Sequence, residues 1–280
     1  MQPKRNLLLI ALSLPALALV ALPIVGLFWR AQLGRIGAYV CCGPVEEALV
    51  LSLTTSAITA VLIVLIGTPL AYWLAYTEFR GKRFVDTLVD LPVILPPAVA
   101  GVALLMTFGR MGLVGKYLSA AGITIPFTTA AVVLAQSFVA GPFYVRQARV
   151  GFEGVPRQLM MASLTMGASP LRTFLRVTVP LASHAILAGL VMAWARAVGE
   201  FGATLMFAGN LEGVTQTMPL AIYTSLETNI NAAIVLSVTL VATSFLVIIV
   251  TKFLLGSGSG GERSFSLPTV SRSRQRVSSG

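Results

Sequence analysis

The feature that most constrains the fold of this chain is the length of its uncharged runs. Residues 48–77 hold no charged side chain for 30 residues, and residues 6–29 hold none for 24. Because an α-helix rises about 1.5 Å per residue, roughly 20 apolar residues cross the ~30 Å hydrocarbon core of a bilayer. The run at 6–29 follows Lys4 and Arg5, but it is longer than the apolar part of a usual signal peptide. Both runs therefore predict helices that span a membrane.

The composition of the whole chain supports the same class. Of its 280 residues, 56% are hydrophobic and 11% are charged, whereas soluble domains carry about 25% charged residues. The net charge of +10 would also suit a nucleic-acid partner. Most of the basic residues, however, flank apolar segments, where positive charge orients membrane helices. We expect an all-α polytopic membrane protein in a lipid bilayer, without a nucleic-acid partner.

Six membrane spans are predicted from the apolar segments. They are residues 6–29, 48–77, 91–108, 127–145, 177–195 and 232–251. The chain thus divides into an N-terminal helix with an external loop (1–47), a core with five spans (48–255) and a disordered basic cytoplasmic tail rich in Gly, Ser and Arg (256–280). With both termini in the cytoplasm, fifteen of the 20 Lys and Arg lie inside, four lie outside and Arg196 lies within a helix. The opposite orientation would reverse this positive-inside bias.

The third predicted span begins with a run of prolines. Pro92, Pro96 and Pro97 in LPVILPPAVAG must kink or break the helix, because proline lacks an N–H and clashes with the preceding turn. Broken backbone at membrane depth is tolerated only where protein or a cavity covers it. We therefore expect this segment to face the interior of the bundle.

A polar loop, residues 155–180, lies between the fourth and fifth spans. Pro156 suits the first position of a helix, and Gly167 suits the left-handed position after its end. Ser169 is a helix cap, and Pro170 is a favoured first residue for a second helix. Residues that repeat on one face of the first helix are Leu159, Ala162 or Ser163, and Met166. The loop is predicted to form a short helix, a glycine turn and a second helix that enters the membrane.

This loop resembles the cytoplasmic loop of permeases in binding-protein-dependent ABC importers. The family pattern is Glu-Ala-Ala, three residues, Gly, nine residues and Ile-x-Leu-Pro. It falls on Met161-Ala162-Ser163, on Gly167 and on Val177 to Pro180, so that Met replaces Glu and Ser replaces the second Ala. The resemblance implies a coupling helix that docks into a groove of an ATPase subunit, and a Met-rich face suits an apolar groove. An amphipathic connector on the membrane surface stays open as the alternative.

The second candidate site is the pair Arg196 and Glu200 at the end of the fifth span. Four residues apart, they share one helix face, and a charge deep in a membrane helix costs about 2.5–3.5 kcal/mol on insertion scales. Such charges mark a pathway or an ion pair, although both side chains could instead snorkel to the external interface. We expect Glu200 to pair with Arg196, within the helix or across a dimer, and favour a partner on another helix because Arg before Glu is the weaker order. The candidate pathway or gate residues are Arg196, Gly199, Glu200, Gly202 and Thr204.

The surrounding sequence is similar to a narrower family, the permeases of molybdate/tungstate ABC importers. The stretches GEFGATLMFAGN (199–210), GVTQTMPLAIYTSLET (213–228), LPPAVAG (95–101) and FGRMGLVG (108–115) occur in the same order within residues 48–252. Sulfate and thiosulfate permeases carry a related Gly-Glu-Tyr/Phe-Gly stretch and are the alternative. The resemblance implies a type I ABC importer permease fold, a homodimer, two ATPase subunits that bind ATP-Mg, and an external oxyanion-binding protein.

Other classes of protein fit the sequence less well. No G-x-x-x-x-G-K-[ST] motif occurs, so the chain is not expected to hydrolyse ATP by that route. An intramembrane enzyme would need a base with a nucleophile, or a metal cluster, and the single histidine, His184, has no partner at a suitable spacing. We therefore expect no catalytic residue, metal or cofactor in this chain. A membrane scaffold would not explain a docking loop joined to a charged helix.

Overall fold

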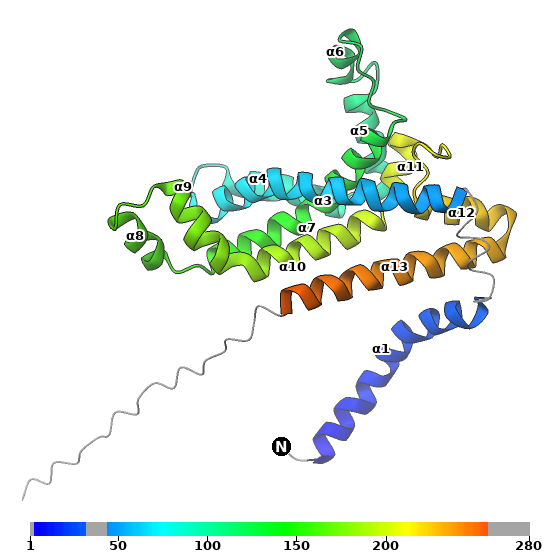
Figure 1. The fold of residues 1–280 in the computed structure, drawn as a ribbon, viewed down its shortest axis with the longest axis horizontal. Coiled ribbons are helices and arrows are strands. Elements are labelled where there is room, and N and C mark those ends of the chain that lie inside the picture. Colours follow the sequence, from blue (N-terminus) through cyan, green and yellow to red (C-terminus); the bar gives the residue numbers. More distant parts are fainter. Residues whose placement is uncertain (1–2, 32–43, 257–280) are drawn as a thin grey trace, which may run out of the picture.

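The computed structural model describes residues 3–31 and 44–256, and within them every regular element is helical (Figure 1). The all-α fold is therefore confirmed. Most of the predicted external loop and of the predicted tail lies outside the described residues. The elements are α1 Pro3–Arg30, α3 Pro44–Tyr76, α4 Lys82–Ile94, α5 Pro97–Phe108, α6 Gly115–Ala120, α7 Thr129–Glu153, α8 Arg157–Thr165, α9 Pro170–Thr173, the π-helical turn η2 Phe174–Thr178, α10 Val179–Val198, α11 Gly202–Ala208, α12 Met218–Thr228 and α13 Ile230–Gly256.

Four helical segments in the described residues are long and apolar enough to cross a membrane. They are Leu12–Arg30, Val45–Tyr76, Pro170–Val198 and Ile230–Ile249. They coincide with the first, second, fifth and sixth predicted spans. The bent pair α4 and α5 would make a fifth. The fourth predicted span corresponds to α7, which carries Arg146, Arg149 and Glu153 near its end, so the count of six stays a prediction.

The core of the bundle is built around α7, which packs between α3 and α10 (Figure 1). Small and hydroxyl side chains make this packing close, as expected in lipid. A Cβ on Gly67 of α3 would lie 2.9 Å from the ring of Tyr144 on α7, and the Tyr144 hydroxyl lies 2.6 Å from that of Thr68. Further along, the buried amide of Gln136 joins the same two helices through Thr55 and Thr59. The close approach and the hydrogen bonds fix the register of α3 on α7.

The proline-rich segment is broken, as its sequence predicts. Helix α4 ends at Ile94, α5 begins at Pro97, and their axes differ by 116°. The helix begins at Lys82, nine residues before the predicted start of the span at Leu91, in a charged stretch whose composition suggests a loop. The charged face of α4 packs on α7, where Arg149 Nη1 lies 2.6 Å from Asp86 Oδ1 and Arg146 pairs with Asp90.

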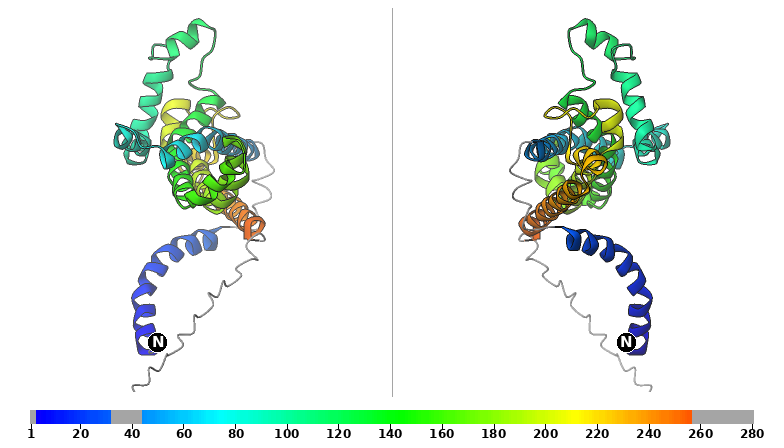
Figure 2. Two further views of the ribbon diagram at one scale, coloured as in Figure 1. Left: turned by 90° about the vertical axis from the view of Figure 1, so that its left-hand side faces the viewer. Right: turned by 90° about the vertical axis from the view of Figure 1, so that its right-hand side faces the viewer.

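Two parts of the chain project away from the bundle. Helix α1 lies to one side and curves along its length, which includes Pro15 and Pro23 (Figures 1 and 2). None of its apolar window is buried within the chain. On another side, α5 starts against α7 and α11, where Ala100 and Leu104 are buried, and its far end projects together with α6 (Figure 2). The bundle itself has an α8 end, formed by α8 and α9, and an α12 end, where α3 and α13 begin (Figure 1).

Candidate functional site

The loop at the α8 end folds as the predicted helical hairpin. Helix α8 begins at Arg157, one residue later than predicted, with Pro156 as its cap. Gly167 has a φ of +85°, so the left-handed turn is confirmed. The Ser169 hydroxyl accepts a hydrogen bond from the N–H of Arg172 at 3.3 Å, and Pro170 is the first residue of α9, as predicted. Residues 170–198 then run as α9, η2 and α10 in direct succession.

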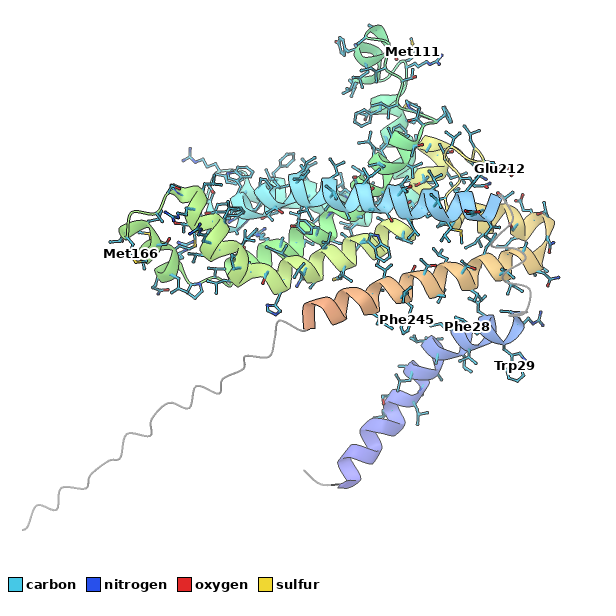
Figure 3. The ribbon with its side chains drawn as sticks, in the orientation of Figure 1. Phe28, Trp29, Met111, Met166, Glu212 and Phe245 are labelled. Carbon is cyan, nitrogen blue, oxygen red and sulfur yellow. The ribbon has the colours of Figure 1, made fainter. Side chains whose placement is uncertain are left out.

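The hairpin presents an apolar face away from the bundle. Leu159 is 47% exposed, Met161 63% and Met166 82%, and Met166 lies at the far tip of the α8 end (Figure 3). Ala162 and Gly167 are exposed as well. Because this surface is left uncovered by the described part of the chain, it is available for a partner.

Other residues of the predicted coupling set have different positions. Ser163 points inward, and its buried hydroxyl lies 3.0 Å from that of Thr173, so it ties α8 to α9. Val177 is half-buried in the π-helical turn, and Pro180 is exposed near the start of α10. These residues shape the hairpin and its junction with the membrane helix. Their role in coupling stays a prediction.

Aromatic side chains join the turn that follows the hairpin helices to the bundle. Tyr76, at the end of α3, donates a hydrogen bond from its hydroxyl to the carbonyl of Phe152 at 2.6 Å. The ring of Tyr72 lies edge-on to Phe152 and to Phe174, with centroids 5.6 and 4.9 Å away. Because these rings come from α3, α7 and η2, a force on the hairpin reaches all three. Sequence reasoning does not find this cluster, since its members are spread over about a hundred residues.

The charged pair lies on the inner side of the bundle, where α10 ends. Arg196 Nη1 lies 2.7 Å from Glu200 Oε2, and their side chains are 32% and 1% exposed. The pair therefore forms within one chain, between the last turn of α10 and the residue that follows its C-cap. The expectation that Arg196 and Glu200 share one helix face is wrong, because α10 ends at Val198 and Glu200 follows its C-cap, Gly199. The turn at Gly199 brings the carboxylate back onto the guanidinium.

Glu200 has a second task that the sequence analysis missed. Its Oε1 accepts a hydrogen bond from the N–H of Ala203 at 2.9 Å, so the carboxylate satisfies a free N–H in the first turn of α11. An acidic side chain there also interacts favourably with the helix dipole. The spacing of three residues between Glu200 and Ala203 is the signal that could have predicted this cap.

Helix α11 connects the charged pair to the broken helix. A Cβ on Gly202 would lie 2.6 Å from Cβ of Pro97, and a Cβ on Gly101 would lie 2.7 Å from the carbonyl oxygen of Ala203. Thr204 is fully buried on the same helix, and its hydroxyl has no hydrogen-bond partner among the described residues. Glycine at both positions therefore allows α5 and α11 to touch.

The break in the third span and Arg196 of the charged pair line the same cavity. Arg196 lines a space of about 120 Å³ together with residues on both sides of the break and two side chains of α7. They are Pro92, Val93, Leu95, Pro97, Ala100, Val139 and Phe143. One side of the broken segment faces this space, whereas Ile94 is 76% and Val99 49% exposed, so the expectation that the whole segment faces the bundle interior stays a prediction. Arg196, Glu200 and Gly202 are thus brought together at the break, with Thr204 buried behind them on α11.

An apolar helical bundle with a broken span beside a charged pair, and a helical hairpin at one end, is the arrangement that the sequence analysis expects of a membrane permease. The chain belongs to the family of binding-protein-dependent transport system inner membrane components, whose pattern matches residues 67–256. Its membrane location and its role as the membrane component of a transport system follow from this family.

Relatives in this family cover most of the chain. The molybdenum transport system permease protein ModB of Mycobacterium tuberculosis is 45% identical over 243 residues, which are 84% of this chain and 90% of the relative. The probable transport system permease protein NifC of Clostridium pasteurianum is 40% identical over 207 residues, 74% of this chain and 72% of the relative. ModB of Escherichia coli K12 is 39% identical over 186 residues, which are 66% of this chain and 81% of the relative.

Solved structures of ABC importers share the fold. A bacterial alginate ABC transporter, in complex with an alginate-bound periplasmic protein, has a chain that superposes with a TM-score of 0.73 at 16% identity, covering 92% of this chain and 96% of that one. The MetNI methionine ABC transporter in an inward-facing conformation gives 0.60 at 19% identity, covering 76% and 95%. The type I ABC importer permease fold is therefore confirmed.

Proposed function

We propose that this chain is the membrane-spanning subunit of an ATP-driven importer that moves molybdate into the cytoplasm. The observation that carries the proposal is the 45% identity to a molybdenum transport permease across 84% of the chain. The relatives in Mycobacterium tuberculosis and Escherichia coli are both named for molybdenum, which favours molybdate over the sulfate alternative. Tungstate has the same tetrahedral geometry and charge and belongs to the same proposal.

The importer needs partners that this chain does not supply. We place two copies of the chain about a two-fold axis, two ATPase subunits that bind ATP-Mg at the α8 end, and an oxyanion-binding protein at the α12 end. The alginate transporter was solved together with its periplasmic protein, which supports the last of these. In this arrangement the chain lies in the inner membrane, and both the α8 end and the two termini face the cytoplasm.

Coupling follows from how the hairpin is joined to the membrane helices. The exposed face of α8 docks into an apolar groove of the ATPase. Because residues 170–198 form a nearly continuous helical run, a displacement of the hairpin moves the far end of α10. That end carries Arg196. ATP-driven closure of the ATPases thus reaches the charged pair through a single rigid element.

The charged pair serves as a gate in this mechanism. Glu200 repels a divalent oxyanion, whereas Arg196 attracts one, and each neutralises the other while they are paired. Tilting α10 relative to α11 separates them, because Glu200 stays fixed to α11 through its bond to Ala203. Arg196 then faces the cavity at the helix break and can attract the passing anion.

Transport by the reconstituted complex tests the proposal. The chain, its ATPase and its binding protein would be placed in proteoliposomes and supplied with labelled molybdate or sulfate. We expect ATP-dependent molybdate uptake that a tenfold excess of sulfate lowers by about a tenth or less. This result requires a discrimination of about a hundredfold or more, which is worth about 2.8 kcal/mol. Uptake of sulfate in preference to molybdate would overturn the substrate assignment.

A further inference from the structure

The segment that projects beside the bundle, residues 97–126, is called the arm here; it contains α5 and α6. It leaves the bundle at the 116° bend and runs across the direction of the long helices, with Met111 at its tip (Figures 1 and 3). Since those long helices cross the membrane, the arm extends sideways from its own bundle. Its tip, residues 109–126, falls between the third and fourth predicted spans, on the external side of the membrane.

The base of the arm is fixed to α11 by the chain segment that enters the arm and by the segment that leaves it. In the entering segment, Gly101 of α5 packs against Ala203 and Met206. In the leaving segment, the N–H of Phe127 donates a hydrogen bond to the carbonyl of Phe207 at 3.4 Å. Phe127 has a φ of +62°, a conformation that is uncommon without glycine. The arm therefore leaves the bundle in a defined direction.

The tip of the arm is also a built structure. Its chain folds back on the end of α5, where the N–H of Val114 donates to the carbonyl of Thr107 at 2.9 Å. The approach is so close that a Cβ on Gly115 would lie 1.9 Å from the carbonyl oxygen of Gly109. A tip held in this way presents a fixed surface for a partner.

The surface of the arm does not suit lipid alone. Met111 is 96% exposed, Leu113 75% and Tyr117 69%. Between these apolar side chains stand Arg110 and Lys116, and the backbone of the tip is largely irregular. Lipid-exposed irregular backbone does not occur in the hydrocarbon region, and a buried cation needs a counter-charge. A protein surface that is apolar and acidic fits the arm.

The α12 end of the bundle carries such a surface. Glu46 and Glu47 in the first turn of α3, Glu212 before α12 and Glu227 near its end are all exposed. None of them, and neither cation of the arm, forms an ion pair within the described residues. Within one chain Met111 and Glu212 lie apart (Figure 3), so the arm and this acidic surface do not meet.

We propose that the arm of each copy packs on the acidic α12 end of a second copy, so that two arms clasp the homodimer. The inference rests on the homodimer of the proposed function and names its contact surface. Two-fold symmetry allows both contacts to form at once, since each copy supplies one arm and one acidic end. The clasp also joins the partner to α11, the element that Glu200 caps, so dimer contact and gate share one helix.

Dimerisation in membranes tests the clasp without cargo or ATPase. Two differently labelled full-length copies would be mixed in liposomes, and the dissociation constant read from energy transfer upon dilution with lipid. We expect Arg110→Glu with Lys116→Glu to raise the dissociation constant about tenfold or more, in the range of close interfacial charge pairs. A second copy with Glu46→Lys, Glu47→Lys and Glu212→Lys should restore association with this reversed arm. Arg83→Glu, an exposed charge reversal at the α8 end, is the matched control and should change nothing.

A cross-linking experiment distinguishes the possible partners of the arm. In a background with Cys41→Ser and Cys42→Ser, Met111→Cys in one copy and Glu212→Cys in a differently tagged copy should form a disulfide between copies on oxidation. An unchanged dissociation constant for the reversed arm, or a Met111→Cys that reacts only with lipid-soluble probes or only with the external binding protein, overturns the clasp. A clasp that forms in an importer without molybdate uptake would contradict the proposed function instead.

Discussion

Arg196 and Glu200 form an ion pair across the end of a helix, with Nη1 and Oε2 separated by 2.7 Å. The second oxygen of the same carboxylate accepts the N–H of Ala203. Glu200 therefore belongs mechanically to α11, whereas Arg196 belongs to α10. A relative movement of these two helices must lengthen the ion pair or break the cap.

The first prediction concerns this pair. Arg196→Ala leaves the carboxylate of Glu200 buried at 1% exposure without its counter-charge, and breaking a buried pair costs about 3–5 kcal/mol. Glu200→Ala should cost a similar amount, because it also removes the cap of α11. The double variant should be less defective than the sum, since no unpaired charge is left. Unfolding in detergent and molybdate uptake of all four proteins complete the cycle.

A control variant distinguishes the two tasks of Glu200. Glu200→Gln keeps an oxygen that can accept from Ala203 but removes the charge. We expect it to preserve more stability than Glu200→Ala while still impairing uptake. Strictly additive defects in the cycle, or full uptake by Glu200→Gln, would mean that the ion pair does not act as a gate.

The amino-acid sequence predicts those features that depend on neighbours along the chain. The left-handed Gly167, the cap at Ser169 and the break at Pro96 and Pro97 each follow from local backbone chemistry. The hairpin and the broken span can therefore be located from the order of the residues alone.

The features that sequence reasoning misses depend on distant partners. The charges of α4 suggest a loop because their counter-charges, Arg146 and Arg149, lie 56 to 63 residues further on. Ser163 fits the pattern of a docking face because nothing nearby shows that its partner, Thr173, belongs to another helix. Helices α11 and α12 fall between the fifth and sixth predicted spans, where the sequence analysis predicts no helix, and α11 packs on α5, about a hundred residues earlier in the chain. Local spacing carries no record of such contacts.

The second prediction concerns the hairpin turn. Gly167→Val places a branched side chain at a φ of +85°, which costs at least about 1–2 kcal/mol for any residue with a Cβ. We expect the variant to insert normally but to lose stimulation of the ATPase and uptake. Gly167→Asn is the matched control, because Asn tolerates this conformation best after glycine. Normal stimulation of ATP hydrolysis by Gly167→Val would remove the hairpin from the coupling mechanism.

The third prediction concerns the residue that stands where the family has glutamate. Met161 is 63% exposed, and if it docks by apolar contact, Met161→Ala should weaken ATPase association by about 1–3 kcal/mol. High salt should change this association little, because no charge is involved at the position. Leu181→Ala, at 51% exposure on α10, is the control and should leave association unchanged. A salt-sensitive loss of affinity specific to Met161→Ala would contradict apolar docking.

The last prediction concerns the contact between α5 and α11. A Cβ on Gly202 would come within 2.6 Å of the Pro97 Cβ, in a proline ring that cannot rotate away, so Gly202→Ala must push the two helices apart. Overpacking of this kind costs about 1–3 kcal/mol, and we expect reduced stability and reduced molybdate uptake together. Gly141→Ala is the matched control, since a Cβ there meets nothing within 4 Å and alanine favours the helix. Thermal unfolding and uptake of both variants would be compared with the parent protein. If Gly202→Ala behaves like Gly141→Ala, the helix break is free to move relative to α11, and the linkage from Glu200 to the broken span does not hold.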